Sequence, residues 1–239
     1  MREDDGSTTR SQERVYQESA EAYDALVAAE DADGHLPRAL AELVDVHGKD
    51  VVDVGAGTGR VTRVALQGAR SVCLVERARP MLELAEQRLG ALGRTGLSFH
   101  VADARALPLP NASVDVAVAG WVFGHFRHWM PQGWRNEVDA AVSEMRRVLR
   151  AQGTLLIIET LGTGHTTPRT HEALDEYFTW LETHHGLTRR WVRTDYAFPD
   201  EVAAARVLGP FFGEAFAERV RRERWARVPE CTGIWSTKR

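Results

Sequence analysis

The segment from Val51 to Arg60 constrains the fold of this chain more than any other part of the sequence. It reads Val-Val-Asp-Val-Gly-Ala-Gly-Thr-Gly-Arg, so a β-branched apolar run passes into three alternating glycines. Such a run is typical of a buried parallel strand. Gly55, Gly57 and Gly59 permit a tight turn and the close approach of a ligand. The amide groups of a following helix would face that ligand. We therefore expect a strand, a nucleotide-binding turn and a helix.

The spacing of these glycines separates the turn from two better-known ones. A dinucleotide fingerprint reads G-x-G-x-x-G, whereas this turn reads G-x-G-x-G and has Asp53 two positions before the first glycine. A P-loop is excluded, because no Gly-Lys-Ser/Thr follows. Glycine-rich turns also occur as plain connectors between a strand and a helix. The assignment of a ligand therefore depends on residues downstream.

Acidic residues end the next two predicted strands. Glu76 follows the apolar strand Ser71–Val75, where an acidic side chain accepts hydrogen bonds from ribose hydroxyls. Asp103 follows the short strand Phe99–Ala102, and an aspartate there can meet the amino group of an adenine. Met81, early in the intervening helix, lies on the adenine face or else packs on the sheet. The three strand ends together predict a nucleoside site.

With two later segments, these residues resemble a class I S-adenosylmethionine-dependent methyltransferase. The segments are Leu107–Asp115, which reads Leu-Pro-Leu-Pro-Asn-Ala-Ser-Val-Asp, and Glu144–Leu155, which matches the helix before the fifth strand. Within the class, the chain is most similar to the small-molecule group called methyltransferase type 11. One difference is Ala151-Gln152-Gly153, where the family usually has Pro-Gly-Gly. The resemblance covers about residues 51–159.

The resemblance implies that S-adenosylmethionine is the cofactor and assigns residues to it. The implied cofactor-binding residues are Asp53, Gly55, Gly57, Glu76, Arg77, Met81, Asp103, Ala104, Gly120 and Trp121. Gly55 and Gly57 would back the methionine moiety, with Asp53 near its ammonium group. Gly120 and Trp121 would border the donor methyl group.

Candidates for the acceptor side are weaker. His125 is the best candidate for a general base, because an imidazole pKa near 6.5 suits proton transfer at neutral pH. Many methyl transfers need no base, and His125 is then a wall residue. The candidate substrate-binding residues are Tyr16, Tyr23, His125, His165 and Tyr177. Trp121, Trp129, Trp134 and Trp180 are further candidates, but aromatic side chains are more often core residues, so we expect only some to line a pocket.

The order of predicted elements favours an α/β fold with a doubly wound, mostly parallel, seven-stranded sheet. The resemblance implies that the last strand is antiparallel. We expect one domain over residues 1–239, divided into a disordered start (1–12), N-terminal helices (13–48), a cofactor-binding core (49–160) and acceptor-side helices with two strands (161–239). The last part should contain a strand over Trp191–Phe198 and helices over about 200–208 and 210–224.

Composition excludes several other classes of protein. A chain of 239 residues suits one α/β domain, and its net charge of −4 argues against a nucleic-acid partner. Cys73 and Cys231 have no metal or redox spacing, and the His residues define no metal site. We expect no secretory leader, no membrane span and a cytoplasmic location. The oligomeric state stays open.

The sequence therefore predicts an enzyme that methylates a small organic acceptor and releases S-adenosylhomocysteine. One alternative is a nicotinamide-dependent oxidoreductase, which the glycine spacing and the lack of a Tyr-x-x-x-Lys motif disfavour. Another is a catalytically silent nucleoside-binding or interaction protein. The identity of the acceptor, and whether O, N, C or S receives the methyl group, stay open.

Overall fold

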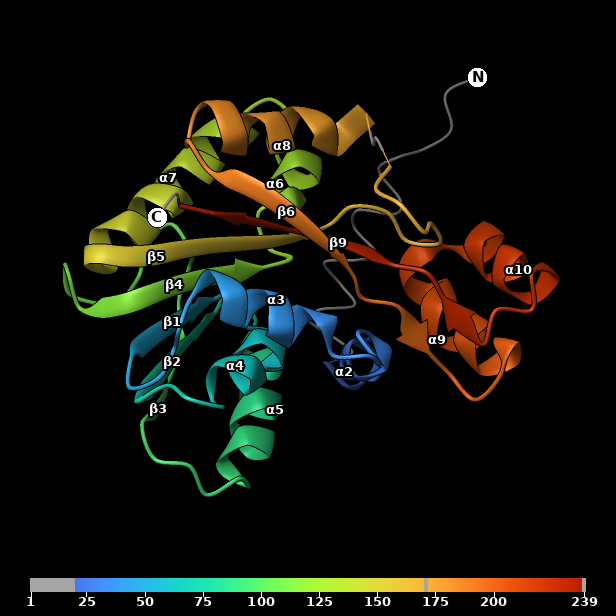
Figure 1. The fold of residues 1–239 in the computed structure, drawn as a ribbon, viewed down its shortest axis with the longest axis horizontal. Coiled ribbons are helices and arrows are strands. Elements are labelled where there is room, and N and C mark those ends of the chain that lie inside the picture. Colours follow the sequence, from blue (N-terminus) through green and yellow to red (C-terminus); the bar gives the residue numbers. More distant parts are fainter. Residues whose placement is uncertain (1–19, 170–171, 238–239) are drawn as a thin grey trace.

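A seven-stranded sheet with helices on both faces forms the centre of the computed structural model, which describes residues 20–169 and 172–237 (Figure 1). Its strands are β1 (Asp50–Val54), β2 (Ser71–Glu76), β3 (Leu97–Val101), β4 (Val114–Gly120), β5 (Leu149–Thr160), β6 (Thr188–Arg193) and β9 (Cys231–Ser236). Their order is β3-β2-β1-β4-β5-β9-β6. Strands β1 to β5 pair in parallel, whereas β9 is antiparallel to β5 and β6. The predicted fold class is confirmed.

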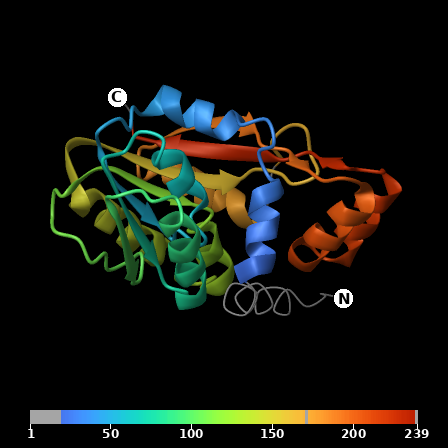
Figure 2. The same ribbon diagram turned by 90° about the horizontal axis from the view of Figure 1, so that it is seen from below.

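The helices belong to two layers and a lateral group. They are α2 (Ala20–Ala29), α3 (His35–Leu43), α4 (Arg60–Ala65), α5 (Arg79–Gly90), α6 (Gly124–Trp129), α7 (Trp134–Val148), α8 (Glu172–Thr183), α9 (Glu201–Phe212) and α10 (Glu214–Arg222). Helices α6 to α8 cover one face of the sheet and α3 to α5 the other (Figure 1). Helices α9 and α10 extend away from the sheet, with α2 between them and α5 (Figure 2).

Strand β5 shows why the sheet needs both layers. Leu155 and Ile157 pack in the core beneath α6 to α8, and Leu156 and Ile158 pack in the core beneath α3 to α5. Successive side chains of a strand point to opposite faces, so an unbroken apolar run is buried on both. The predicted pattern of a doubly wound sheet follows directly from this run.

The C-terminal part differs from the prediction in two places. The expected strand over 191–198 is divided into β6, which pairs with β9, and the short β7 (Tyr196–Ala197), which pairs with β8 (Arg227–Val228). The expected helix break near residue 209 is at Gly213, where φ is +87°. Pro210 lies in the last turn of α9, where the missing amide removes only one helical hydrogen bond. The predicted disorder of residues 1–12 lies outside the described residues.

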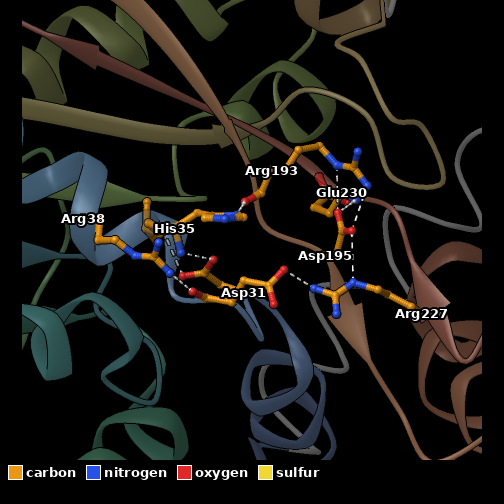
Figure 3. Close-up of polar contacts among 9 residues, drawn as sticks. Asp31, His35, Arg38, Arg193, Asp195, Arg227 and Glu230 are labelled. Carbon is orange, nitrogen blue, oxygen red and sulfur yellow. Dashed lines mark hydrogen bonds and ion pairs between the residues drawn. The ribbon is translucent and has the colours of Figure 1, made fainter.

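A chain of polar contacts fixes the corner between α2 and α3 to the distant C-terminal strands (Figure 3). Asp31 accepts hydrogen bonds from the backbone amide of His35, and His35 Nδ1 donates to the Arg193 carbonyl oxygen, both at 2.8 Å. Arg193 is paired with Asp195 at 2.7 Å, and Asp195 with Arg227 at 3.3 Å. These contacts hold α2 in place beside the carboxyl ends of the central strands.

Candidate active site

A cavity opens where the strand order reverses between β1 and β4, the usual ligand crevice of an open α/β sheet. We call it the cofactor cavity. It is lined by Tyr23, Gly55, Gly57, Val75, Glu76, Arg77, Ala78, Met81, Ala102, Asp103, Ala104, Gly120, Trp121, Val122, His125, Phe126 and Trp129. The structure thus brings together every predicted cofactor-binding residue except Asp53.

The turn after β1 requires glycine for two separate reasons. Gly55 has φ +69°, and a Cβ atom there would lie 2.3 Å from Cγ2 of Val122. Gly57 has φ +54°, and its Cβ would point toward Tyr23 and Met81, at 3.5 and 3.6 Å. Because both of those side chains line the cofactor cavity, a side chain at residue 57 would occupy part of its space. The glycines therefore shape the turn and keep the cavity open.

Glu76 connects the glycine turn to the start of α5. Its Oε2 accepts a hydrogen bond from the amide of Gly57 at 3.0 Å, and its Oε1 accepts one from the amide of Ala78 at 2.7 Å. Burial raises the pKa of this carboxyl, and these amides oppose the rise. The carboxylate is thus held at the end of β2 and faces the cofactor cavity.

Two aspartates of the predicted site have different surroundings. Asp53 is 1% exposed and accepts a hydrogen bond from the Thr62 hydroxyl at 2.6 Å, and burial raises its pKa to about 6. It does not line the cavity, because its carboxylate is turned toward α4. Asp103 lines the cavity, and its ion pair with Arg105 at 2.6 Å lowers its pKa. Of the two, Asp103 lines the cavity, and the predicted place of Asp53 near the ammonium group stays a prediction.

A larger cavity of about 590 Å³, which we call the acceptor cavity, adjoins the first. It is lined by Tyr23, Leu26, Val27, Glu30, Arg60, Trp121, Gly124, His125, His128, Glu159, Thr160, Leu161, Gly162, Thr163, His165, Arg169, Leu174, Phe178, Tyr196, Phe211 and Phe212. Tyr23, Trp121 and His125 line both cavities. The volume is that of a site for a small organic ligand.

Trp121 occupies the boundary between the cavities in an unusual backbone conformation. Its φ is +57°, rare for a residue other than glycine, and its amide donates to the Ile158 carbonyl oxygen at 2.6 Å. The Arg60 guanidinium lies 3.6 Å from the centre of its ring, and Arg60 pairs with the buried Glu30 at 2.7 Å. The Arg60–Glu30 pair thus holds the indole by a contact with its ring, and the backbone hydrogen bond fixes the residue.

The structure places only part of the predicted acceptor side at this cavity. Tyr23, His125 and His165 line it, whereas Tyr16 lies outside the described residues. Tyr177 is fully buried and donates to Oε1 of Glu159 at 2.9 Å instead of lining either cavity. Of the other aromatic candidates, Trp129 lines the cofactor cavity, and Trp134 and Trp180 pack against one another between α7 and α8.

Several residues that line the acceptor cavity were not indicated by the sequence. Glu30, Arg60, Phe211 and Phe212 line the acceptor cavity from parts of the chain that lie far apart in the sequence. No spacing relates these positions, because only the tertiary packing of α2, α4 and α9 brings them together. Arg60 had one local signal, since it directly follows the last glycine of the turn.

His125 is stacked on Trp129, with ring centres 4.9 Å apart. Burial, together with the neighbouring His128, lowers its pKa to about 4. The imidazole is therefore neutral at pH 7, but a group with so low a pKa is a weak proton acceptor. The proposed role of His125 as a general base stays a prediction.

The lowered pKa of His125 gives a prediction for acid stability. Below its ordinary pKa of 6.5 the unfolded chain binds a proton that the folded protein takes up only near pH 4. Stability should therefore fall as the pH falls through this interval. In His125→Asn, urea unfolding should show a smaller fall than in the wild type. His47→Asn, at an exposed position, is the control, and equal slopes in all three proteins would contradict the assignment.

One group of potential metal ligands occurs among the described residues. The ligand atoms of Asp139, His184 and His185 lie within 4.8 Å of one another. Asp139 Oδ1 accepts hydrogen bonds from Trp180 and His185, both at 2.8 Å, which accounts for the cluster as a contact between α7 and α8. None of these residues lines either cavity.

Within the described part of the chain, no helix is both long and apolar enough to cross a membrane.

The sheet order, the glycine turn and the acidic strand ends are together the features of a class I methyltransferase. Residues 52–157 match a family model described as a methyltransferase domain. This confirms the resemblance inferred from the sequence.

Individual relatives support the same family. An uncharacterized methyltransferase of Anoxybacillus flavithermus is 26% identical over 152 residues, or 61% of this chain and 66% of the relative. Demethylmenaquinone methyltransferase of Thermotoga maritima is 30% identical over 161 residues, which are 65% of this chain and 64% of the relative. The chain thus covers less than two thirds of either curated relative. The solved structure of YcgJ from Bacillus subtilis has a TM-score of 0.61 at 15% identity, covering 86% of this chain and 99% of YcgJ, and shares the fold.

Proposed function

We propose that this chain transfers the methyl group of S-adenosylmethionine to a small organic acceptor. The observation that carries the proposal is the meeting of the two cavities at Tyr23, Trp121 and His125. A nucleoside-type site at the strand ends thereby adjoins a separate space of suitable size for a second substrate. The Thermotoga relative, named for demethylmenaquinone, supports a small-molecule acceptor.

The residues present fit the proposed cofactor. Gly57 keeps space next to Tyr23 and Met81, which a Cβ atom would fill. Glu76, Asp103 and Ala104 line the same cavity, where Glu76 would accept hydrogen bonds from the ribose hydroxyls and Asp103 with the Ala104 amide would bind the adenine. When bound, the cofactor supplies a methyl group already activated by its sulfonium. The protein then has to orient the acceptor for in-line attack and exclude water.

Calorimetric titration with S-adenosylhomocysteine, S-adenosylmethionine and NAD tests this proposal. We expect the two sulfur nucleosides to bind and NAD to bind far more weakly, because the turn lacks the dinucleotide spacing. Incubation with methyl-labelled S-adenosylmethionine and a panel of hydroxylated, amine and thiol acceptors should then yield a labelled product. Tight NAD binding would favour the oxidoreductase alternative. Binding without transfer to any acceptor would favour a silent binding protein.

A further inference from the structure

We propose that Glu159 accepts the proton of the methylated group, and that the acceptor is an uncharged, mainly apolar molecule presenting a hydroxyl to it. This inference rests on the methyl-transfer function proposed above. It assigns to Glu159 a role beyond that of a hydrogen-bonding residue at the end of a strand.

The sheet places Glu159 beside the point where the cavities meet. Glu159 follows Ile158 in β5, and Ile158 is paired with Gly120 of β4. Gly120 lines the cofactor cavity, and Glu159 lines the acceptor cavity with His125. Its side chain emerges on the same face as Ile157, beneath α6 and α8. The carboxylate is therefore on the acceptor side of the boundary.

The protein holds this carboxylate mainly through one oxygen. Oε1 accepts hydrogen bonds from the amide of Gly124 at 3.0 Å and from the Tyr177 hydroxyl at 2.9 Å. A Cβ atom on Gly124 would lie 3.2 Å from Oε2, so the glycine leaves room beside that oxygen. Gly124 itself lines the acceptor cavity. A substrate hydroxyl can therefore approach Oε2 over Gly124.

The surroundings also suit proton transfer at neutral pH. Burial raises the pKa of Glu159 to about 7, and hydrogen bonds from the Gly124 amide, the Tyr177 hydroxyl and the Phe123 amide oppose the rise. The other titratable and charged groups that line the same cavity are Tyr23, Glu30, Arg60, His125, His128, His165, Arg169 and Tyr196. A carboxyl with this pKa is a better proton acceptor than His125, whose pKa is lowered to about 4.

The cavity walls indicate the chemical class of the acceptor. Seven aliphatic and phenylalanine side chains line the cavity, namely Leu26, Val27, Leu161, Leu174, Phe178, Phe211 and Phe212. The charges of Arg60 and Glu30 neutralise one another at 2.7 Å. An acceptor cation would be repelled by the sulfonium, and a neutral amine has no need of a base before attack. A hydroxyl group must lose its proton, which is the step that Glu159 serves.

The proposed step methylates the hydroxyl oxygen of the acceptor. The hydroxyl oxygen forms a bond to the methyl carbon while the carbon–sulfur bond breaks, and the electron pair of that bond stays on sulfur. The hydroxyl proton passes to Oε2 of Glu159. The products are a methyl ether, S-adenosylhomocysteine and a protonated Glu159, which returns its proton to water.

A matched pair of probes tests this role. Protein saturated with S-adenosylhomocysteine is titrated with 2-naphthol and with 2-methoxynaphthalene, which lacks the hydroxyl proton. We expect the wild type to bind 2-naphthol at least about tenfold more tightly, the scale of a hydrogen bond to a charged group. Glu159→Gln keeps an oxygen for Gly124 and Tyr177 but takes no proton. It should lose most of this preference and bind S-adenosylhomocysteine as the wild type does.

Turnover of 2-naphthol distinguishes catalysis from packing. With S-adenosylmethionine, Glu159→Gln should methylate it about 10²-fold more slowly. Tyr177→Phe keeps the carboxylate but removes a donor that lowers its pKa, so the acidic limb of the rate profile should move to higher pH. An unshifted limb, a Gln variant with wild-type preference, or failure of 2-naphthol to bind beside bound S-adenosylhomocysteine would overturn the inference. Failure of S-adenosylhomocysteine itself to bind would instead refute the proposed function.

Discussion

Replacing Glu76 with alanine is expected to weaken S-adenosylhomocysteine binding about tenfold or more. The substitution removes the acceptor of the Gly57 and Ala78 amides, at 3.0 and 2.7 Å, and the proposed acceptor of the ribose hydroxyls. A hydrogen bond to a charged group contributes about 1.5–3 kcal/mol, and 1.4 kcal/mol corresponds to a tenfold change in affinity. Isothermal titration calorimetry of the folded variant measures the effect.

Two further variants serve as a control and as an intermediate case for the Glu76→Ala experiment. Glu83→Ala removes an exposed carboxylate from the same helix that Glu76 precedes, and its affinity for the cofactor product should match the wild type. Glu76→Gln keeps an acceptor oxygen without the charge, so its affinity should lie between those of the wild type and Glu76→Ala. Wild-type affinity in a folded Glu76→Ala protein would exclude a role of this carboxylate in binding.

Gly55→Ala is expected to have the second large effect, on both stability and cofactor affinity. The added methyl group would lie 2.3 Å from Cγ2 of Val122, so the turn or the segment after β4 has to move. Overpacking typically costs about 1–3 kcal/mol, and the left-handed backbone adds about 1–2 kcal/mol for a residue with a Cβ. Urea unfolding should therefore show a clear loss of stability, and calorimetry a weaker cofactor site.

Gly93→Ala is the matched control for the backbone contribution. Gly93 also has a positive φ, +64°, but a Cβ atom there would have no neighbour within 4 Å. The difference in stability between the two variants therefore measures the contact with Val122 alone. If Gly55→Ala loses no more stability than Gly93→Ala, the close approach of the turn to Val122 has no energetic consequence.

Local sequence patterns were sufficient to predict the parallel strands of the sheet. The apolar runs of β1, β2 and β4 are buried on both faces, so their composition alone indicates parallel strands. The division between β6 and β7 was not predictable, because it depends on which partner each segment pairs with. β6 pairs with β9 at the edge of the main sheet, whereas β7 pairs with β8 outside it.

The cofactor cavity and the acceptor cavity also differed in how far the sequence could predict them. The proposed cofactor residues could be located because parallel strands end at one edge of a sheet, and Glu76 and Asp103 each follow such a strand. Asp53 does not line the cavity because its side chain points toward Thr62, a direction that the sequence does not encode locally, and its role in cofactor binding stays a prediction. The acceptor cavity is built from side chains of helices packed across the strand ends, so Glu30 and Phe211 carried no local signal.

The wall shared by the two cavities has a thermodynamic consequence. Tyr23, Trp121 and His125 face both spaces, so a ligand on one side fixes side chains that the ligand on the other side must contact. If the proposed cofactor and acceptor bind in these two cavities, their binding equilibria are linked through these three residues. Linkage is reciprocal, so the factor by which the first ligand changes affinity for the second equals the factor in the opposite direction. We therefore expect cooperativity between the two ligands to depend on one indole, one phenol and one imidazole.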